Sequence, residues 1–185
     1  LAPRLGESLG QQLVIDNRAG AAGTIGADIV AKAAPDGYTI MLHSATHVAN
    51  ASLYSKLPYD AVKDFTAVAL IASQPTIMVV QPSLPAQSVQ DLIALAKAQP
   101  GSLHYGSGGA GSALHMSAAL FARIAGINIV HVPYKGGGPA VIALLGGEVQ
   151  LLTATVPEVV GLIKAGKLRA LAVCSSQRSP LLPEL

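Results

Sequence analysis

The sequence predicts an α/β fold in which helices pack against a buried parallel or mixed β-sheet. Of the 185 residues, 51% are apolar, 12% are charged and only 4% are aromatic. A composition rich in Ala, Val, Leu and Ile is typical of strands that helices cover on both faces. Short apolar stretches of strand length alternate with helical stretches along the whole chain, which is the rhythm of crossover connections. The chain is long enough to bury a core, either as one medium domain or as two small lobes.

The first third of the chain is expected to contain two helices and three strands. Leucines one helical turn apart in residues 1–9, followed by a glycine, predict the end of an amphipathic helix. Strand-like apolar stretches occur at 12–16, 38–43 and 64–72. A helix is expected at about 24–34, with its first threonine as the cap, before a Pro-Asp-Gly turn.

Strands and helices alternate more regularly in the rest of the chain, where Pro82 and Pro85 separate the first strand from the first helix. Ser88 is expected to cap that helix. The segment 79–84 leaves one αβ unit and the segment 170–175 returns to it, which favours two lobes joined by two crossings. The predicted strands are 76–80, 103–105, 129–132, 149–153 and 168–173, and the predicted helices are 89–98, 113–125, 139–145 and 157–165.

Charge and hydropathy exclude several functional classes. The formal net charge is +2 and the arginines are scattered, whereas nucleic-acid binding needs a basic patch or stripe. No apolar run reaches the roughly 18 residues that span a bilayer, so membrane insertion is not expected. Cys174 is the only cysteine, so no intrachain disulfide forms. The chain starts without an initiator Met or a signal peptide, and we expect the true N-terminus to lie upstream of Leu1.

The most informative stretch is the glycine-rich run 106–112, between a predicted strand and a predicted helix. Unpaired backbone N–H groups and the positive end of the helix dipole gather at such a junction. Glycines let the backbone approach a ligand closely, and Ser107 and Ser112 add hydroxyl donors. The run therefore favours binding of an anion such as a carboxylate, a phosphate or a sulfate. A flexible turn with Ser112 as an ordinary N-cap is the alternative.

The same run matches the dinucleotide-binding pattern G-x-G-x-x-G at Gly106, Gly108 and Gly111. A dinucleotide fold also needs an acidic residue about 20 positions later, on the ribose. His131 stands at that place, and no acid occurs between Gly111 and Glu148. We therefore expect no cofactor. An α/β enzyme that binds a nucleotide or a phosphorylated substrate at the same glycine run is the alternative function.

Catalysis and metal binding find little support in the sequence. It lacks a nucleophile elbow, a Cys–His arrangement, a phosphate-binding lysine motif and a prominent carboxylate pair. His43 and His47 are four residues apart, but no acidic ligand accompanies them, so no metal site is expected. The remaining histidines, at positions 104, 115 and 131, are expected to be capping or core residues.

Two further loops are candidates for ligand contact. Ser44, Thr46 and His47 follow a predicted strand, which is where open α/β sheets bind ligands. Loop polarity without a ligand explains them equally well. Tyr134 ends another strand and is expected in a pocket, whereas Lys135 is expected to be solvated.

Motifs in order along nearly the whole chain carry a resemblance to a known family. They are 14–26, 34–39, 52–60, 63–65, 105–112 with His115, 132–136, 164–173 and 178–180. In these the chain resembles the tripartite tricarboxylate transporter substrate-binding proteins, the Bug-type receptors. The resemblance implies a type 2 periplasmic-binding-protein (Venus flytrap) fold with two lobes and central mixed sheets. It also implies a periplasmic receptor, monomeric when full length, that captures a small di- or tricarboxylate for the membrane permease subunits of a transporter and catalyses nothing.

Carried over by position, the resemblance predicts the lobes and the site. The first lobe would comprise 1–81 and 171–185, and the second 82–170. In the family, backbone amides, hydroxyls and bridging waters hold the carboxylate with few ion pairs, in agreement with the glycine-rich run. The residues expected at the ligand are Ala45, Thr46 and His47 in the first lobe, Ser107, Gly109, Gly111 and Ser112 in the second, and Tyr134, Thr155 and Pro157 at the rear of the cleft.

Departures from the family pattern limit this prediction. The family's first strand and the ligand-binding loop after it would lie upstream of Leu1, and later elements of the first lobe would lie beyond Pro183. We therefore expect an incomplete first lobe and weak or no ligand binding by these residues alone. The family often has an aromatic residue, an Asp and an Asn where this chain has Thr153, Ala154 and Thr155, which argues against an amino-acid ligand.

Overall fold

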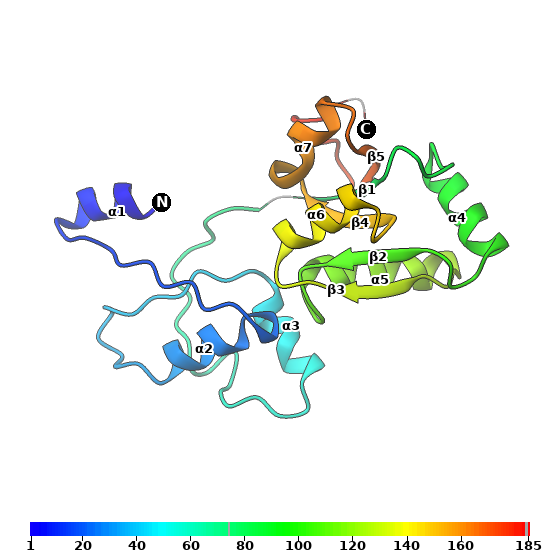
Figure 1. Ribbon diagram of the computed structural model, residues 1–185. Helices are drawn as coiled ribbons and strands as arrows, with labels where there is room; N and C mark the ends of the chain where they lie inside the picture. Colours follow the sequence, from blue (N-terminus) through cyan, green and yellow to red (C-terminus); the bar gives the residue numbers. More distant parts are fainter. Residues whose placement is uncertain (74, 184) are drawn as a thin grey trace.

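The computed structural model describes residues 1–73, 75–183 and 185, and it has one mixed β-sheet with helices on both faces (Figure 1). The sheet order is β3-β2-β4-β1-β5. Its strands are β1 (Thr76–Val80), β2 (His104–Ser107), β3 (Val130–Pro133), β4 (Leu151–Thr155) and β5 (Arg169–Val173). The mixed α/β class and the five strands predicted after residue 75 are confirmed, with shifts of one or two residues at most of their ends.

Strand direction brings several loops to one edge of the sheet. β2 pairs in parallel with β3 and β4, while β1 runs antiparallel to β4 and to β5. The carboxyl ends of β2, β3, β4 and β5 therefore lie at the edge where β1 begins. Open α/β sheets bind ligands at the carboxyl ends of their strands, so this edge is the place to look for a site.

Alternating side chains of β1 divide the core into two layers. Ile77 and Val79 pack with residues of α6 (Gly137–Gly146) and α7 (Val156–Lys164) on one face. Met78 and Val80 pack with residues of α4 (Val89–Ala98) and α5 (Ala113–Ala125) on the other. The period of two along a strand explains this division, and burial on both faces explains why the strand is apolar throughout.

The helix α4 begins as its sequence predicts. The Ser88 side chain accepts a hydrogen bond from the Asp91 N–H, and the Asp91 carboxylate accepts one from the Ser88 N–H. This capping box satisfies two N–H groups that the helix cannot satisfy itself. Hydrogen bonds to its carboxylate from the Gln87 N–H, which is the largest cause, and from the hydroxyl and the N–H of Ser88 hold the pKa of Asp91 below its ordinary value.

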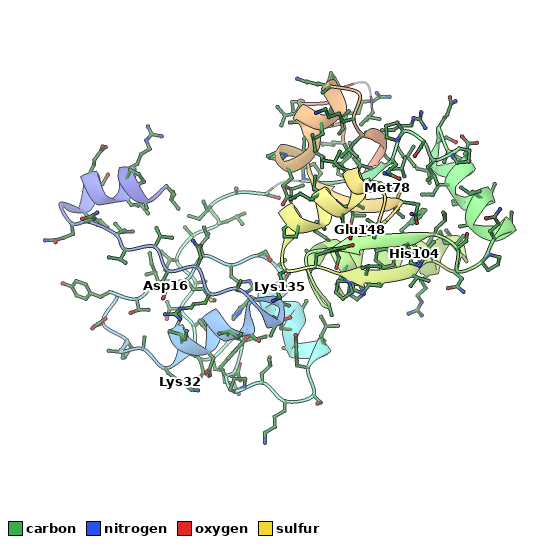
Figure 2. All side chains as sticks on the ribbon, viewed as in Figure 1. Asp16, Lys32, Met78, His104, Lys135 and Glu148 are labelled. Carbon is green, nitrogen blue, oxygen red and sulfur yellow. The ribbon has the colours of Figure 1, made fainter. Side chains whose placement is uncertain are left out.

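The first part of the chain, residues 1–73, is helical and extended rather than sheet-like. It contains α1 (Ala2–Leu9), the short 3-10 helix η1 (Ala21–Gly23), α2 (Thr24–Ala31) and α3 (Thr46–Leu53). Its small buried cluster centres on Ala27, Tyr59 and Ala61. Figure 2 shows side chains around Asp16 and Lys32 projecting from separate stretches of chain, whereas Met78 lies in the packed region.

Three predictions for this part are wrong. The segments 12–16, 38–43 and 64–72 are not strands, although their sequences are strand-like. A strand needs a hydrogen-bonding neighbour, and no described residue pairs with them. Most of their large apolar side chains are accordingly exposed: Val14 is 90% exposed and Val68 is 87% exposed.

One helix prediction is also corrected, and one helix was missed. Thr24 is the first residue of α2 rather than its cap, since Gly23 takes that place, and the helix ends at Ala31 rather than near 34. The helix α3 was not predicted, because the polar residues 44–47 indicate a loop. The expected lobe boundaries, between 81 and 82 and between 170 and 171, stay a prediction. Both β1 and β5 are paired strands of the one sheet.

Candidate functional site

The glycine loop, residues 106–112, lies at the binding edge of the sheet. It leaves the carboxyl end of β2 and leads into α5, whose N-cap is Ser112. It also approaches the start of α6, because a Cβ at Gly108 would lie 3.4 Å from the Gly136 carbonyl carbon and from the Gly137 nitrogen. Two helix N-termini therefore converge on the loop, and their dipoles favour negative charge there.

Two glycines of the loop are required by its backbone. Gly109 has a φ of 123° and Gly111 a φ of 79°, both in the left-handed region that other residues rarely adopt. A Cβ at Gly111 would also meet the Leu53 side chain at 3.0 Å. The loop thus needs glycine for its shape as well as for close approach to a ligand.

Part of the loop's hydrogen-bonding capacity is used internally. The Gly109 N–H donates to Ser107 Oγ over 3.1 Å, and the Gly111 N–H donates to His115 Nδ1 over 3.1 Å. The Ser112 hydroxyl accepts from the His115 N–H as an N-cap. Among the described residues, the N–H groups of Gly108, Ala110 and Gly136 make no hydrogen bond. The N–H groups of Gly108, Ala110 and Gly136 are therefore available to donate hydrogen bonds to a ligand anion.

Ser107 and two imidazoles support the loop from below. Ser107 is fully buried, and its Oγ lies 2.7 Å from His131 Nε2. The His131 ring stacks on that of His115 with centroids 4.0 Å apart, and Tyr105 stacks on His131 at 5.0 Å. Burial lowers the pKa of His131 to about 4, with the charge of His115 as the second cause. Burial also lowers the pKa of His115, so both rings are neutral near pH 7.

The first part of the chain meets the glycine loop through α3. The Ala113 N–H, at the start of α5, donates to Thr46 Oγ1 over 3.1 Å. Thr46 is thereby brought to the loop, and Ala45 stands beside it as the N-cap of α3. The predicted site residues Thr46, Ser112 and Gly111 therefore lie together. Because the Thr46 hydroxyl accepts the hydrogen bond of the Ala113 N–H, this donor at the start of α5 is not available to a ligand.

His47 lies in a different environment. Its Nε2 is 2.9 Å from the Ala61 carbonyl oxygen, and its ring packs edge-on to Phe65 at 4.6 Å and stacks on Tyr59 at 5.8 Å. These contacts make it part of the aromatic cluster of the first part. A role for His47 at the ligand stays a prediction.

Asn50 is a residue of this region that the sequence analysis missed. It is fully buried, its Nδ2 donates to the Ala22 carbonyl over 3.1 Å, and its Oδ1 would lie 3.8 Å from a Cβ on Gly111. It joins η1 and α3 beside the glycine loop. Asn50 follows Thr46 by four residues, a spacing that places two side chains on the same face of a helix. This spacing could have indicated its role only if the helix α3 had been predicted.

The residues expected at the rear of the cleft are already engaged in other contacts. The Tyr134 hydroxyl donates to Glu148 over 3.2 Å, and its ring lies against Gly106. Burial is the first cause that raises the pKa of Tyr134, followed by the Glu148 carboxylate. Thr155 donates its hydroxyl to Glu158 over 2.7 Å, and Pro157 lies in the first turn of α7.

The carboxylate of Glu158 restricts where an anion can bind near the glycine loop. It accepts hydrogen bonds from the N–H and the hydroxyl of Thr155, and it lies against Gly137 at the start of α6. A second anion beside it would be repelled. A ligand carboxylate therefore fits better on the Gly108 and Ala110 side of the loop.

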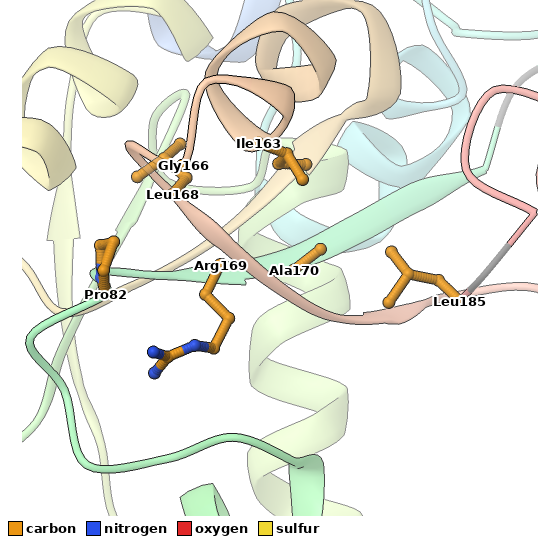
Figure 3. A pocket seen from close by; sticks show the side chains of 7 residues that line it. All are labelled: Pro82, Ile163, Gly166, Leu168, Arg169, Ala170 and Leu185. Carbon is orange, nitrogen blue, oxygen red and sulfur yellow. The ribbon is translucent and has the colours of Figure 1, made fainter.

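Two cavities lie away from the glycine loop. One, of about 380 Å³, is lined by apolar residues of α7 and β5 together with Arg169 (Figure 3). The Arg169 guanidinium is already used, since Nη1 donates to the carbonyls of Leu84 and Ala86 over 3.2 and 3.0 Å. The other, of about 290 Å³, lies beside Tyr54 and Asp60. Because Arg169 is engaged at the first cavity and the Asp60 carboxylate would repel an anion at the second, we place the candidate anion site at the loop.

The fold and the site define a class of protein. The architecture is that of periplasmic binding proteins, and residues 1–185 match the tripartite tricarboxylate transporter family receptor. The chain belongs to this family, and the resemblance drawn from its motifs is confirmed. None of the helices in the described ranges is both long enough and apolar enough to cross a membrane.

Relatives with known names support the same assignment. The protein BugT of Bordetella pertussis is 42% identical over 185 residues, which are 99% of this chain and 57% of that protein. The structure of R. palustris Rpa4515 with adipate is 42% identical, has a TM-score of 0.94 and is covered over 62% of its length by the whole of this chain. MatC from Rhodopseudomonas palustris with bound malate is 33% identical, with a TM-score of 0.92, and is covered over 63%. The chain thus spans about 57% of the length of that curated relative.

Proposed function

We propose that this protein is a periplasmic receptor that captures a small organic acid, a di- or tricarboxylate, and delivers it to the permease subunits of a tripartite tricarboxylate-type transporter. It catalyses no reaction. Membership of the receptor family supports the class. Relatives of 42% and 33% identity that hold adipate and malate support a carboxylate ligand.

The convergence of free backbone donors at the glycine loop carries the proposal. The N–H groups of Gly108, Ala110 and Gly136 are unused among the described residues and lie where α5 and α6 begin. Several such donors compensate for the lost hydration of a carboxylate without a buried arginine. Two of the predicted site glycines, Gly109 and Gly111, would give the loop the shape that aims these donors.

The remaining site residues are proposed from their positions. Ala45, Thr46 and His47 would line the first lobe, and Ser107 and Ser112 would hold the loop of the second. Tyr134, Thr155 and Pro157 would frame the rear. Residues 1–81 with 171–185, and residues 82–170, would form two lobes that close on the ligand, because contacts to both lobes favour the closed state.

Isothermal calorimetry of the full-length gene product tests the carboxylate ligand. We expect heat with at least one of adipate, malate and citrate. Normal folding by circular dichroism together with no heat from any of these acids would overturn the assignment. Thermal stabilisation by ATP alone would instead favour the enzyme alternative at Gly106–Gly111.

A matched pair of glycine variants locates the site. Gly109→Ala forces a side chain onto a φ of 123° and should weaken acid binding about tenfold or more, because the loop loses its shape. Gly161→Ala is the control, since Gly161 lies in α7 and a Cβ added there would meet no other residue within 4 Å. Equal affinities of the two variants would place the ligand elsewhere.

A further inference from the structure

The rings of Tyr105, His131 and His115 form a stack beneath the glycine loop. They come from β2, β3 and α5, and neighbouring centroids are 5.0 and 4.0 Å apart. Each imidazole of the stack is hydrogen-bonded to the loop through a single ring nitrogen. The stack therefore joins the loop to the sheet and to the helix that follows.

Hydrogen bonds fix the proton on His115. The Gly111 N–H is a donor, so His115 Nδ1 must accept and carries no proton. The ring is then the neutral form with its proton on Nε2. A proton added at Nδ1 would face the Gly111 N–H and remove the bond.

His131 supports the other glycine through a serine. Its Nε2 lies 2.7 Å from Ser107 Oγ, which in turn accepts from the Gly109 N–H over 3.1 Å. Gly109 and Gly111, the two loop glycines with positive φ, are thus each tied to one imidazole. The two imidazoles therefore hold the two loop residues whose φ is positive.

We propose that His115 and His131 are positioning residues that hold the glycine loop in its ligand-binding shape, and that protonation of His115 releases the loop and the ligand. The inference rests on the proposed function for its ligand. The positioning itself concerns only this chain's own contacts. Acid-driven release from the carboxylate site is its functional consequence.

The surroundings of the stack favour a neutral pair near pH 7. The titratable groups that face His115 are His131 from β3 and Tyr105 from β2. The neighbouring elements α3 and β4 present Thr46 and Thr153, which do not titrate. Burial lowers the pKa of both imidazoles, and no carboxylate contributes to either shift. Two charged rings 4.0 Å apart would repel each other, so acid protonates one of them first.

Two substitutions of His115 separate its bond from its proton. In His115→Asn, the amide oxygen stands near the place of Nδ1 and accepts from Gly111 but does not titrate. Calorimetry of the full-length gene product with adipate and malate should give this variant an affinity near that of the wild type at pH 7.5. Between pH 7.5 and 4.5, the wild type should lose affinity relative to His115→Asn, up to about tenfold per pH unit below the pKa of His115. The ratio of the two affinities removes the titration of the ligand itself.

His115→Leu removes the acceptor and leaves a buried N–H without a partner. Its affinity at pH 7.5 should fall about tenfold or more. His104→Asn is the matched control, since His104 lies on β2 outside the stack, and it should bind as the wild type does. Full affinity in His115→Leu, or the same pH dependence in wild type and His115→Asn, would overturn the proposal.

A measurement without ligand distinguishes failure of the positioning role of the histidines from failure of the proposed carboxylate binding. The ¹⁵N shifts of His115 at pH 7.5 should show an unprotonated Nδ1 and a protonated Nε2. The Gly111 amide should exchange with solvent faster in His115→Leu than in His115→Asn. A protonated Nδ1 would overturn the positioning role. The expected shifts without binding of any acid would leave the positioning intact and overturn the carboxylate function.

Discussion

Ser107 shows how a single buried hydroxyl organises the loop. Its oxygen lies within 3.1 Å of the Gly109 nitrogen and carbonyl oxygen and 2.7 Å from His131 Nε2. With its hydrogen-bonding capacity used in this way, the side chain acts on the loop rather than as a free donor. From the sequence alone, Ser107 is a plausible ligand donor, because the partner His131 lies 24 residues away and spacing does not reveal the contact.

Removal of this hydroxyl should destabilise the fold. Ser107→Ala leaves the Gly109 N–H and the His131 nitrogen without a partner in a buried site, and we expect a loss of about 1–3 kcal/mol in the free energy of unfolding. Urea titration measures it. The control Ser102→Ala removes an exposed hydroxyl that bonds only the Gln99 carbonyl, and should change stability by less than about 0.5 kcal/mol. Equal losses in the two variants would contradict the role of Ser107.

The depressed pKa of His131 gives the protein an acid-sensitive stability. An unfolded histidine takes up a proton below about pH 6.5, whereas His131 in the fold does so only near 4. Acid therefore favours the unfolded state, and the free energy of unfolding should fall as the pH is lowered from 6.5 to 4. Urea titrations across this range check the slope. His131→Gln should have a smaller slope, and an unchanged slope would show that another group is responsible.

At the scale of elements, helices and strands differ in how well the sequence predicts them. The helix α4 follows from Ser88, Asp91 and an apolar face, all within a dozen residues. The strand β1 is also predicted, and its neighbours β4 and β5 lie within the same chain. Segment 12–16 has equally strand-like residues but no partner among the described residues. Local pattern therefore predicts an element only when the contacts that complete it are present.

The helix α6 offers a matched test of the core. Leu144 is fully buried against the sheet, while Ile142, on the same helix, is 71% exposed. Leu144→Ala should cost about 2–5 kcal/mol through lost burial and the cavity that remains. Ile142→Ala should change stability by less than about 0.5 kcal/mol. Chemical denaturation of both variants gives the comparison, and similar values would show that α6 does not pack as described.

On the scale of the whole molecule, stability is concentrated in the sheet and its helices. The two larger buried clusters both include residues of β1 and β4, whereas the first part has only the small cluster around Ala27 and Tyr59. The contacts that join the parts include the hydrogen bond from the Ala113 N–H to Thr46 and the approach of Leu53 to Gly111. The sequence predicts both regions as α/β units, but it does not predict this imbalance, because burial depends on which neighbours are present.

Hydrogen exchange should reveal the imbalance directly. Amides of 12–16, 38–43 and 66–72 lack paired neighbours and should exchange within seconds to minutes at pH 7, because little unfolding is needed to expose them. Amides of β1 and β4 should exchange at least about a hundredfold more slowly, since opening them disrupts the core. Mass spectrometry of peptic peptides resolves both sets. Comparable protection of 12–16 and of β4 would mean that these segments are paired after all.

The two ends of the sheet region meet, since the Cys174 N–H donates to the Thr76 carbonyl over 2.8 Å. The first and last residues of segment 76–174 are therefore neighbours in space. Such a segment is suited to domain insertion, because a segment with adjacent termini can be inserted into a surface turn of a host protein without distorting either protein. Placed between the halves of a fluorescent reporter, it would couple changes at its glycine loop to an optical signal.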